Sequence, residues 1–94
     1  MKFNLNEFKN FYFASSKYAE QEKLLDAFLY EWQSMNKTTW KDGWLVHMDY
    51  SLVKEKFNAK MKSDLKVRLQ GKGFSTQGIE GLFRCLTKWV NAHL

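Results

Sequence analysis

The residue types that most often carry catalysis are few in this chain and far apart. Neither of its two histidines, His47 and His93, belongs to a metal-ligand spacing such as His-Glu-x-x-His. The single cysteine, Cys85, lies in an apolar stretch beside Arg84, whereas a nucleophilic cysteine needs an exposed electropositive site and a base. We therefore expect no catalytic residue and no metal site, and we expect Cys85 to be a buried or nearly buried thiol.

Motifs for phosphate-binding loops and hydrolases are also missing from the sequence. The Gly-Lys-Gly sequence at 71–73 lacks the spacing and the Lys-Ser/Thr pair that cradle a nucleotide phosphate. The Gly-Phe-Ser sequence at 73–75 is not a nucleophile elbow, because residue 77 is glutamine. No pair of carboxylates stands out for acid–base work. The sequence predicts a protein that is not an enzyme and has no cofactor and no small-molecule substrate.

The one positive chemical signal is a basic segment. Residues 54–72 contain seven Lys or Arg against Glu55 and Asp64, so these nineteen residues hold a net charge of +5, equal to that of the whole chain. Cations that neutralise phosphates release counterions, which gives affinity and a steep dependence on salt. We expect this segment to contact DNA or RNA phosphates. The predicted contact residues are Lys54, Lys56, Lys60, Lys62, Lys66, Arg68 and Lys72.

Groups able to read bases are fewer in this segment. Asn58, Gln70 and Arg68 can form hydrogen bonds with base edges, and Arg84 and Lys88 are lesser candidates for phosphate contact. The sequence leaves open whether the partner is DNA or RNA and whether it is single- or double-stranded. A solvated lysine face that only keeps the protein soluble is the alternative interpretation.

Two tryptophans suggest a second type of surface. Trp40 and Trp44 flank a predicted turn, where they can stack on unpaired bases or anchor a protein partner. The alternative function is therefore a protein–protein interaction protein: a regulator, inhibitor or accessory subunit encoded by a phage or mobile element. Its partner would be another protein or a second copy of this chain.

Length and composition indicate one domain, 1–94. A chain of 94 residues with 45% hydrophobic residues has room for a single core. One cysteine excludes an intrachain disulfide. No run approaches the roughly 18 apolar residues of a membrane span, and residues 1–7 lack the apolar region of a secretory signal. We expect a cytoplasmic protein that does not enter a membrane.

Helix signals are clear at both ends of the chain. Asn4 followed by Glu7 predicts a capped first helix. Apolar residues at helical spacing predict a second helix that ends near Met35. Ser75 or Thr76 can cap a final helix. The predicted apolar face of that helix consists of Ile79, Leu82, Phe83, Leu86, Trp89 and Val90.

Strand signals occupy the middle of the chain. Asp42-Gly43 predicts a two-residue hairpin turn between β-branched and aromatic residues, and alternation of side chains continues to Ser51. Over 65–70 apolar and polar residues alternate, which predicts another strand. The segment 52–62 fits both periods, because its lysines alternate as in a strand while its apolar residues recur every four positions as in a helix.

We therefore predict an α+β fold with two N-terminal helices, a small antiparallel sheet that starts at the Asp42-Gly43 hairpin, and a C-terminal helix. If 52–62 is helical, the alternative is a winged helix-turn-helix. The run Leu25–Trp32, followed by a strand, a lysine-rich stretch and Gly73-Phe74, resembles winged-helix domains attached to mobile-element and viral primases. That resemblance also implies binding to nucleic acid.

A second resemblance rests on the predicted order of helix, three strands and helix. With Gly71, Gly73 and Ser75 ahead of the last helix, this order resembles a double-stranded-RNA-binding domain. That family has paired lysines at the start of its last helix, where this chain has Thr76 and Gln77. The phosphate-clamping part of that family is therefore missing here.

Overall fold

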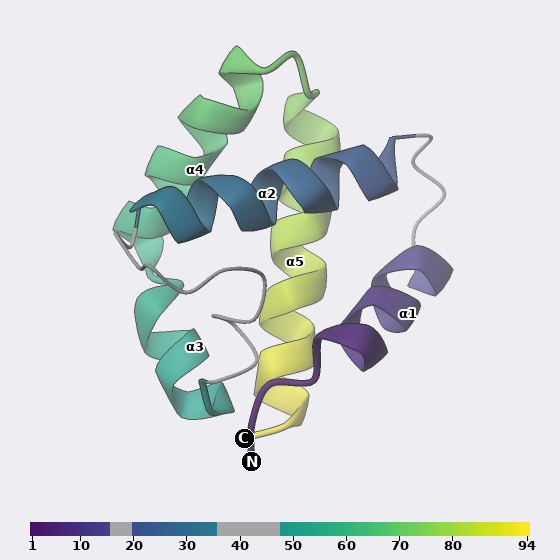
Figure 1. The fold of residues 1–94 in the computed structure, drawn as a ribbon, viewed down its shortest axis with the longest axis vertical. Coiled ribbons are helices and arrows are strands. Elements are labelled where there is room, and N and C mark those ends of the chain that lie inside the picture. The colour runs from purple at the N-terminus through teal and green to yellow at the C-terminus, as the bar shows by residue number, and fades with distance from the viewer. Residues whose placement is uncertain (16–19, 36–47) are drawn as a thin grey trace.

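The structure of the chain is a computed structural model that describes residues 1–15, 20–35 and 48–94. These ranges contain five helices: α1 (Leu5–Ser15), α2 (Gln21–Met35), α3 (Tyr50–Lys56), α4 (Ala59–Gly71) and α5 (Thr76–Ala92). In Figure 1, α3 and α4 follow one another along one side of α5, α1 lies on its other side, and α2 crosses in front. Because α5 contacts all four of the other helices, it is the central element of the fold.

Side-chain caps define where four of these helices begin. Each cap is a side-chain oxygen that accepts a hydrogen bond from a backbone N–H in the first turn, which would otherwise have no partner in the helix. The capping residues are Asn4 for α1, Asp49 for α3, Asn58 for α4 and Ser75 for α5. The predicted caps Asn4 and Ser75 are confirmed, as is the end of α2 at Met35.

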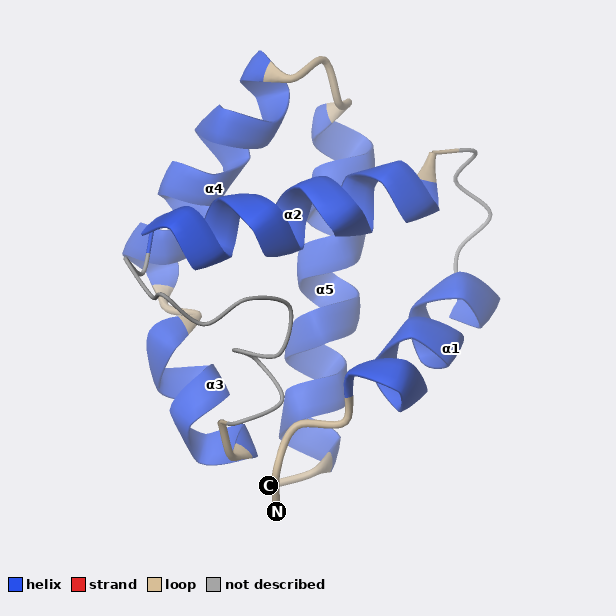
Figure 2. Ribbon diagram, in the orientation of Figure 1, coloured by secondary structure: helices blue, strands red, loops and turns tan. Residues whose placement is uncertain are grey.

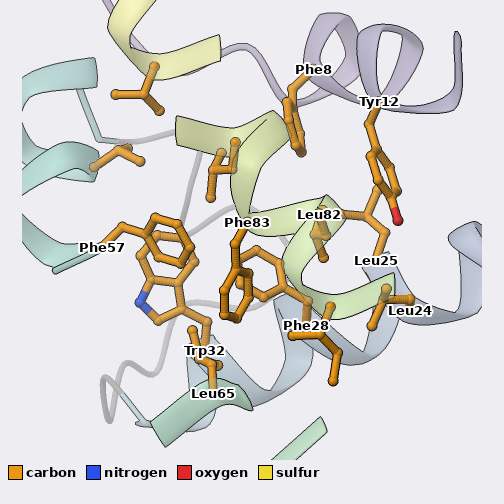
Figure 3. Close-up of a cluster of buried hydrophobic side chains, with 14 of the residues drawn as sticks. Phe8, Tyr12, Leu24, Leu25, Phe28, Trp32, Phe57, Leu65, Leu82 and Phe83 are labelled. Carbon is orange, nitrogen blue, oxygen red and sulfur yellow. The ribbon is translucent and has the colours of Figure 1, made fainter. Parts of the chain in front are cut away.

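The core is formed by apolar stripes that meet on α5. Its buried side chains match the predicted face, and only Trp89 is half-buried, with its ring centroid 5.2 Å from that of Phe11 on α1. Figure 3 shows Phe28 and Trp32 from α2 meeting Phe57 and Phe83 in one aromatic cluster. Burial of large rings is the main stabilising contribution in a domain of this size.

Residues 50–71 form two helices and not strands, so the predicted antiparallel sheet is wrong. Figure 2 shows no strand in the part of the chain that the structure describes, where the single β-feature is an isolated bridge between Lys2 and Asp49. The winged-helix alternative also fails for these residues, because a wing needs a β-hairpin. The helical interpretation of 52–62 is confirmed, with a break at residues 57–58. The predicted Asp42-Gly43 hairpin lies outside the described residues.

The burial pattern explains why 65–70 is helical. Leu65 and Leu69 are fully buried, whereas Val67 between them is 66% exposed. Alternation on a strand would place all three on one face, but on a helix Val67 points away from the other two. The cap at Asn58 and a sequence rich in Lys, Leu, Ala, Met and Arg favour the helix further.

The two ends of the described chain meet beside the start of α3 (Figure 1). The backbone N–H of Phe3 donates to the carbonyl of Met48 at 2.8 Å, and the N–H of Asn4 donates to the hydroxyl of Tyr50 at 3.1 Å. The ring of His93 stacks on the ring of Tyr50 at a centroid distance of 4.7 Å. These contacts tie both ends to α3, and they give His93 a packing role.

The turn between α4 and α5 depends on glycine. Gly73 has a φ of +95°, a backbone conformation that other residues rarely adopt. The N–H groups of Lys72 and Phe74 both donate to the carbonyl of Leu69, which closes the end of α4. The turn brings the C-terminal end of α4 and the start of α5 together, so that the two helices can pack side by side.

Candidate functional site

The seven predicted phosphate-contact residues lie on α3, on α4 and at the C-cap of α4. Successive side chains project about 100° apart around a helix, so positions that would share one face of a strand point in different directions. On α4, Lys62 and Lys66 are four residues apart and share one side. Arg68 projects from the opposite side, toward α2. The cations therefore do not form the single charged face that the strand prediction implied.

On the side of α4 that faces α2, two of the cations pair with a buried carboxylate. Glu31 is only 9% exposed, and its carboxylate oxygens lie 3.7 Å from Nη1 of Arg68 and 3.7 Å from Nζ of Lys72. The same Lys72 Nζ lies 5.1 Å from the centroid of the Tyr30 ring. A buried carboxylate needs opposite charge nearby to offset its loss of hydration. Arg68 and Lys72 thus connect α4 to α2.

On the α5 side, Lys66 is also paired. Its Nζ donates to Oε1 of Glu80 at 2.8 Å. This hydrogen bond, together with the positive charge of Lys66, lowers the pKa of Glu80 below its usual value. The Glu80 carboxylate consequently stays ionised to a lower pH and neutralises the charge of Lys66 at this point of the surface.

The other four cations are Lys54, Lys56, Lys60 and Lys62. They form no ion pair with any residue in 1–15, 20–35 or 48–94, and we refer to them as the unpaired lysines. They lie within nine residues, on α3 and at the start of α4. Lys62 is half-buried, with its Nζ 5.1 Å from the centroid of the Phe57 ring, and the other three are exposed. The basic segment thus divides into a paired set and an unpaired set.

Two of the unpaired lysines line a cavity of about 160 Å³ where α3, α4 and α5 come together. The cavity is lined by Lys54, Phe57, Lys62, Thr87, Val90 and Asn91. Thr87 and Asn91 lie one turn apart on α5 and were not among the predicted site residues. The sequence signal for them is a polar pair at i, i+4 spacing, and this spacing does not indicate which lysines the pair would face.

The three predicted base-reading side chains are already engaged within the fold. The side-chain oxygen of Asn58 caps α4. Nε2 of Gln70 donates to Oγ1 of Thr76 at 2.7 Å, and Arg68 pairs with Glu31. A side chain that contacted a base edge from these positions would first have to give up its contact in the fold.

Arg84 and Lys88 belong to a different part of the surface. They line a cavity of about 360 Å³ between α1 and α5, together with Phe11, Ser15, Gly81 and Cys85. Burial raises the pKa of the Cys85 thiol, and the charges of Arg84 and Lys88 oppose this effect less strongly. Cys85 is therefore a half-buried thiol that stays protonated at neutral pH, in agreement with the prediction from the sequence.

Alkylation kinetics test the state of this thiol. The thiolate is the reactive form, so a raised pKa in the folded protein leaves less of it at any given pH. Iodoacetamide at pH 8 should alkylate Cys85 several-fold more slowly in the native protein than in the same protein unfolded in urea. The native rate should also rise with pH through a midpoint above that of the unfolded chain. Equal rates, or a native midpoint below the unfolded one, would contradict the burial of this thiol.

Within the described ranges, no three His, Cys, Asp or Glu side chains lie close enough together to hold a metal ion. The same residues include no helix with the length and apolar character needed to cross a membrane.

Trp40, Trp44 and His47 lie outside the described residues, so the predicted aromatic surface stays a prediction. No protein-family model, no curated protein and no solved structure matches this chain.

Proposed function

We propose that this protein binds nucleic acid and that the unpaired lysines contact its phosphates. The observation that carries the proposal is the concentration of four cations within nine residues, none of them paired with a carboxylate of the described chain. An ammonium group without a partner can exchange its water and mobile counterions for a phosphate at little cost to the fold.

The arrangement of α3 and α4 suits a polymer of phosphates better than a single small anion. The two helices follow one another along one side of α5 (Figure 1), and the unpaired lysines lie on α3 and at the start of α4. Lys54 and Lys62 line one cavity between α3, α4 and α5, whereas Lys56 and Lys60 are exposed and lie outside it. Cations at these two places on the surface can contact successive phosphates of one strand.

The contacts inside the fold favour binding that tolerates many base sequences. Asn58, Gln70 and Arg68 are engaged in the contacts described above. Phosphate contacts set the position of a protein on nucleic acid but carry no sequence information directly. We therefore expect affinities for oligonucleotides of different base sequence to be similar, and we expect salt to change the affinity far more than sequence does.

A comparison of two double variants tests the proposal. K56Q/K60Q removes two unpaired lysines that lie outside the cavity, and K66Q/K72Q removes the same amount of charge from paired lysines. Binding to labelled single- and double-stranded DNA and RNA is measured by fluorescence anisotropy over a series of salt concentrations. For four phosphate contacts, log Kd should change with log salt with a slope of about 3 to 4. K56Q/K60Q should lower that slope by about 2, whereas K66Q/K72Q should leave it nearly unchanged.

Circular dichroism of both variants verifies that they are folded. Equal losses of affinity in the two variants would show that only net charge matters and would refute the assignment to the unpaired lysines. The absence of binding at low salt to all four nucleic acids would refute the proposed function. A stoichiometric complex with another protein that tolerates salt would then favour the interaction-protein alternative.

A further inference from the structure

The cavity between α3, α4 and α5 has the features of a site for one phosphate group. Four side chains that can donate hydrogen bonds line it: Lys54, Lys62, Thr87 and Asn91. Within the described part of the chain, none of these four side chains forms a hydrogen bond or an ion pair. Lys54 and Asn91 are exposed, whereas Lys62 and Thr87 are half-buried. Donors from three separate helices thus line one small cavity without a partner among the described residues of the fold.

The walls of the cavity strengthen attraction for an anion. Phe57 and Val90 are 7% and 3% exposed and supply apolar surface beside the two ammonium groups. Apolar walls reduce the local screening by water, so a charge–charge interaction there is stronger than on an open surface. Lys62 is already held at the cavity, because its Nζ lies 5.1 Å from the centroid of the Phe57 ring.

The charge beside the cavity and the number of substituents on the phosphate distinguish a terminal phosphate from one inside a strand. An internal phosphodiester carries one negative charge and two sugar substituents that must both leave the cavity, whose sides are formed by three helices. A terminal phosphate monoester carries a charge of about −1.5 to −2 at neutral pH and has one substituent. The two ammonium groups of Lys54 and Lys62 match that charge, and Thr87 and Asn91 can donate to the oxygen atoms that the lysines leave free.

We infer that this cavity binds the terminal phosphate monoester of a nucleic-acid strand. The inference rests on the proposed function, because the remainder of the strand would lie along Lys56 and Lys60 outside the cavity. In this arrangement the cavity fixes the position of the strand end, and the exposed lysines supply affinity that does not depend on the end.

The test uses one single-stranded oligonucleotide with a 5′-phosphate, a 3′-phosphate or hydroxyl groups at both ends, with the label attached internally. Charge-assisted hydrogen bonds from the cavity should make one of the phosphorylated forms bind about tenfold more tightly than the hydroxyl form. Thr87→Val and Asn91→Asp should abolish that difference, because the first removes a donor and the second adds a repelling charge. Asn10→Asp makes the same charge change at an exposed position of α1 and should preserve the tenfold difference.

A titration with inorganic phosphate, followed by the NMR signal of the Asn91 side-chain amide, separates this inference from the proposed function. A shift of the Asn91 signal together with tighter binding of a phosphorylated end supports the inference. Equal affinity for phosphorylated and hydroxyl ends overturns it and leaves the proposed function standing. A shift with inorganic phosphate but no binding of any oligonucleotide overturns both, and assigns the cavity to a free phosphate compound.

Discussion

Phe57→Ala should lower the free energy of unfolding by about 3–5 kcal/mol, the range measured when buried phenylalanines are truncated. The ring is 7% exposed, and its centroid lies 5.3 Å from those of Trp32 and Phe83 and 5.9 Å from that of Phe28. Phe57 therefore joins the end of α3 to the centre of the core. Small domains have a total stability of about 5–15 kcal/mol, so this variant should lose a large fraction of it.

Urea denaturation followed by tryptophan fluorescence measures the effect. Phe13→Ala is the matched control, because Phe13 is 39% exposed on α1 and contacts the neighbouring Tyr12 ring. Truncation of Phe13 should lower the free energy of unfolding by less than about 1 kcal/mol. If Phe57→Ala does not express, Phe57→Leu keeps most of the volume and measures the loss of the ring contacts in a folded protein. If Phe57→Ala and Phe13→Ala unfold at the same urea concentration, the placement of Phe57 in the core is contradicted.

Leu65→Ala should lower the free energy of unfolding by several kcal/mol more than Val67→Ala does, although the two residues lie in the same short segment. Leu65 is fully buried, so its truncation should cost about 2–5 kcal/mol. Val67 is 66% exposed, and alanine is a better helix former than valine, so Val67→Ala should change stability by no more than about 0.5 kcal/mol. The difference follows from the helical structure of α4.

The same pair of variants gives the opposite result for a strand. On a strand, Leu65 and Val67 would point to the same face and both truncations would be costly. Thermal unfolding monitored by circular dichroism at the helical band measures the two midpoints in one experiment. A Val67→Ala midpoint as low as that of Leu65→Ala would refute α4 as described here.

The helices near the two ends of the chain could be predicted from local signals. The cap at Asn4, the apolar spacing that ends at Met35 and the cap at Ser75 each depend on residues that are close together in the sequence. Such signals act in the same way whatever the rest of the chain does. These predictions are confirmed for that reason.

The middle of the chain could not be predicted in this way, because its apolar residues recur every four positions. Residues four apart share a face both on a strand, where the period is two, and on a helix, where they are separated by about 40°. Val53, Phe57, Leu65 and Leu69 satisfy both periods, and all four are buried. The exposed position of Val67 decides between the two periods, and only the packing of α4 against α2 and α5 determines it.

The location of the charge was determined by the sequence alone, whereas the availability of each cation was decided by the tertiary structure. Arg68 and Lys72 pair with Glu31 from α2, and Lys66 pairs with Glu80 from α5. These carboxylates lie on other helices, beyond the reach of any local pattern. The same holds for the convergence of α5 with α3 and α4 at the cavity. A count of charges gives only their sum, but the interaction of two charges depends on the distance and the solvent between them, and folding determines both.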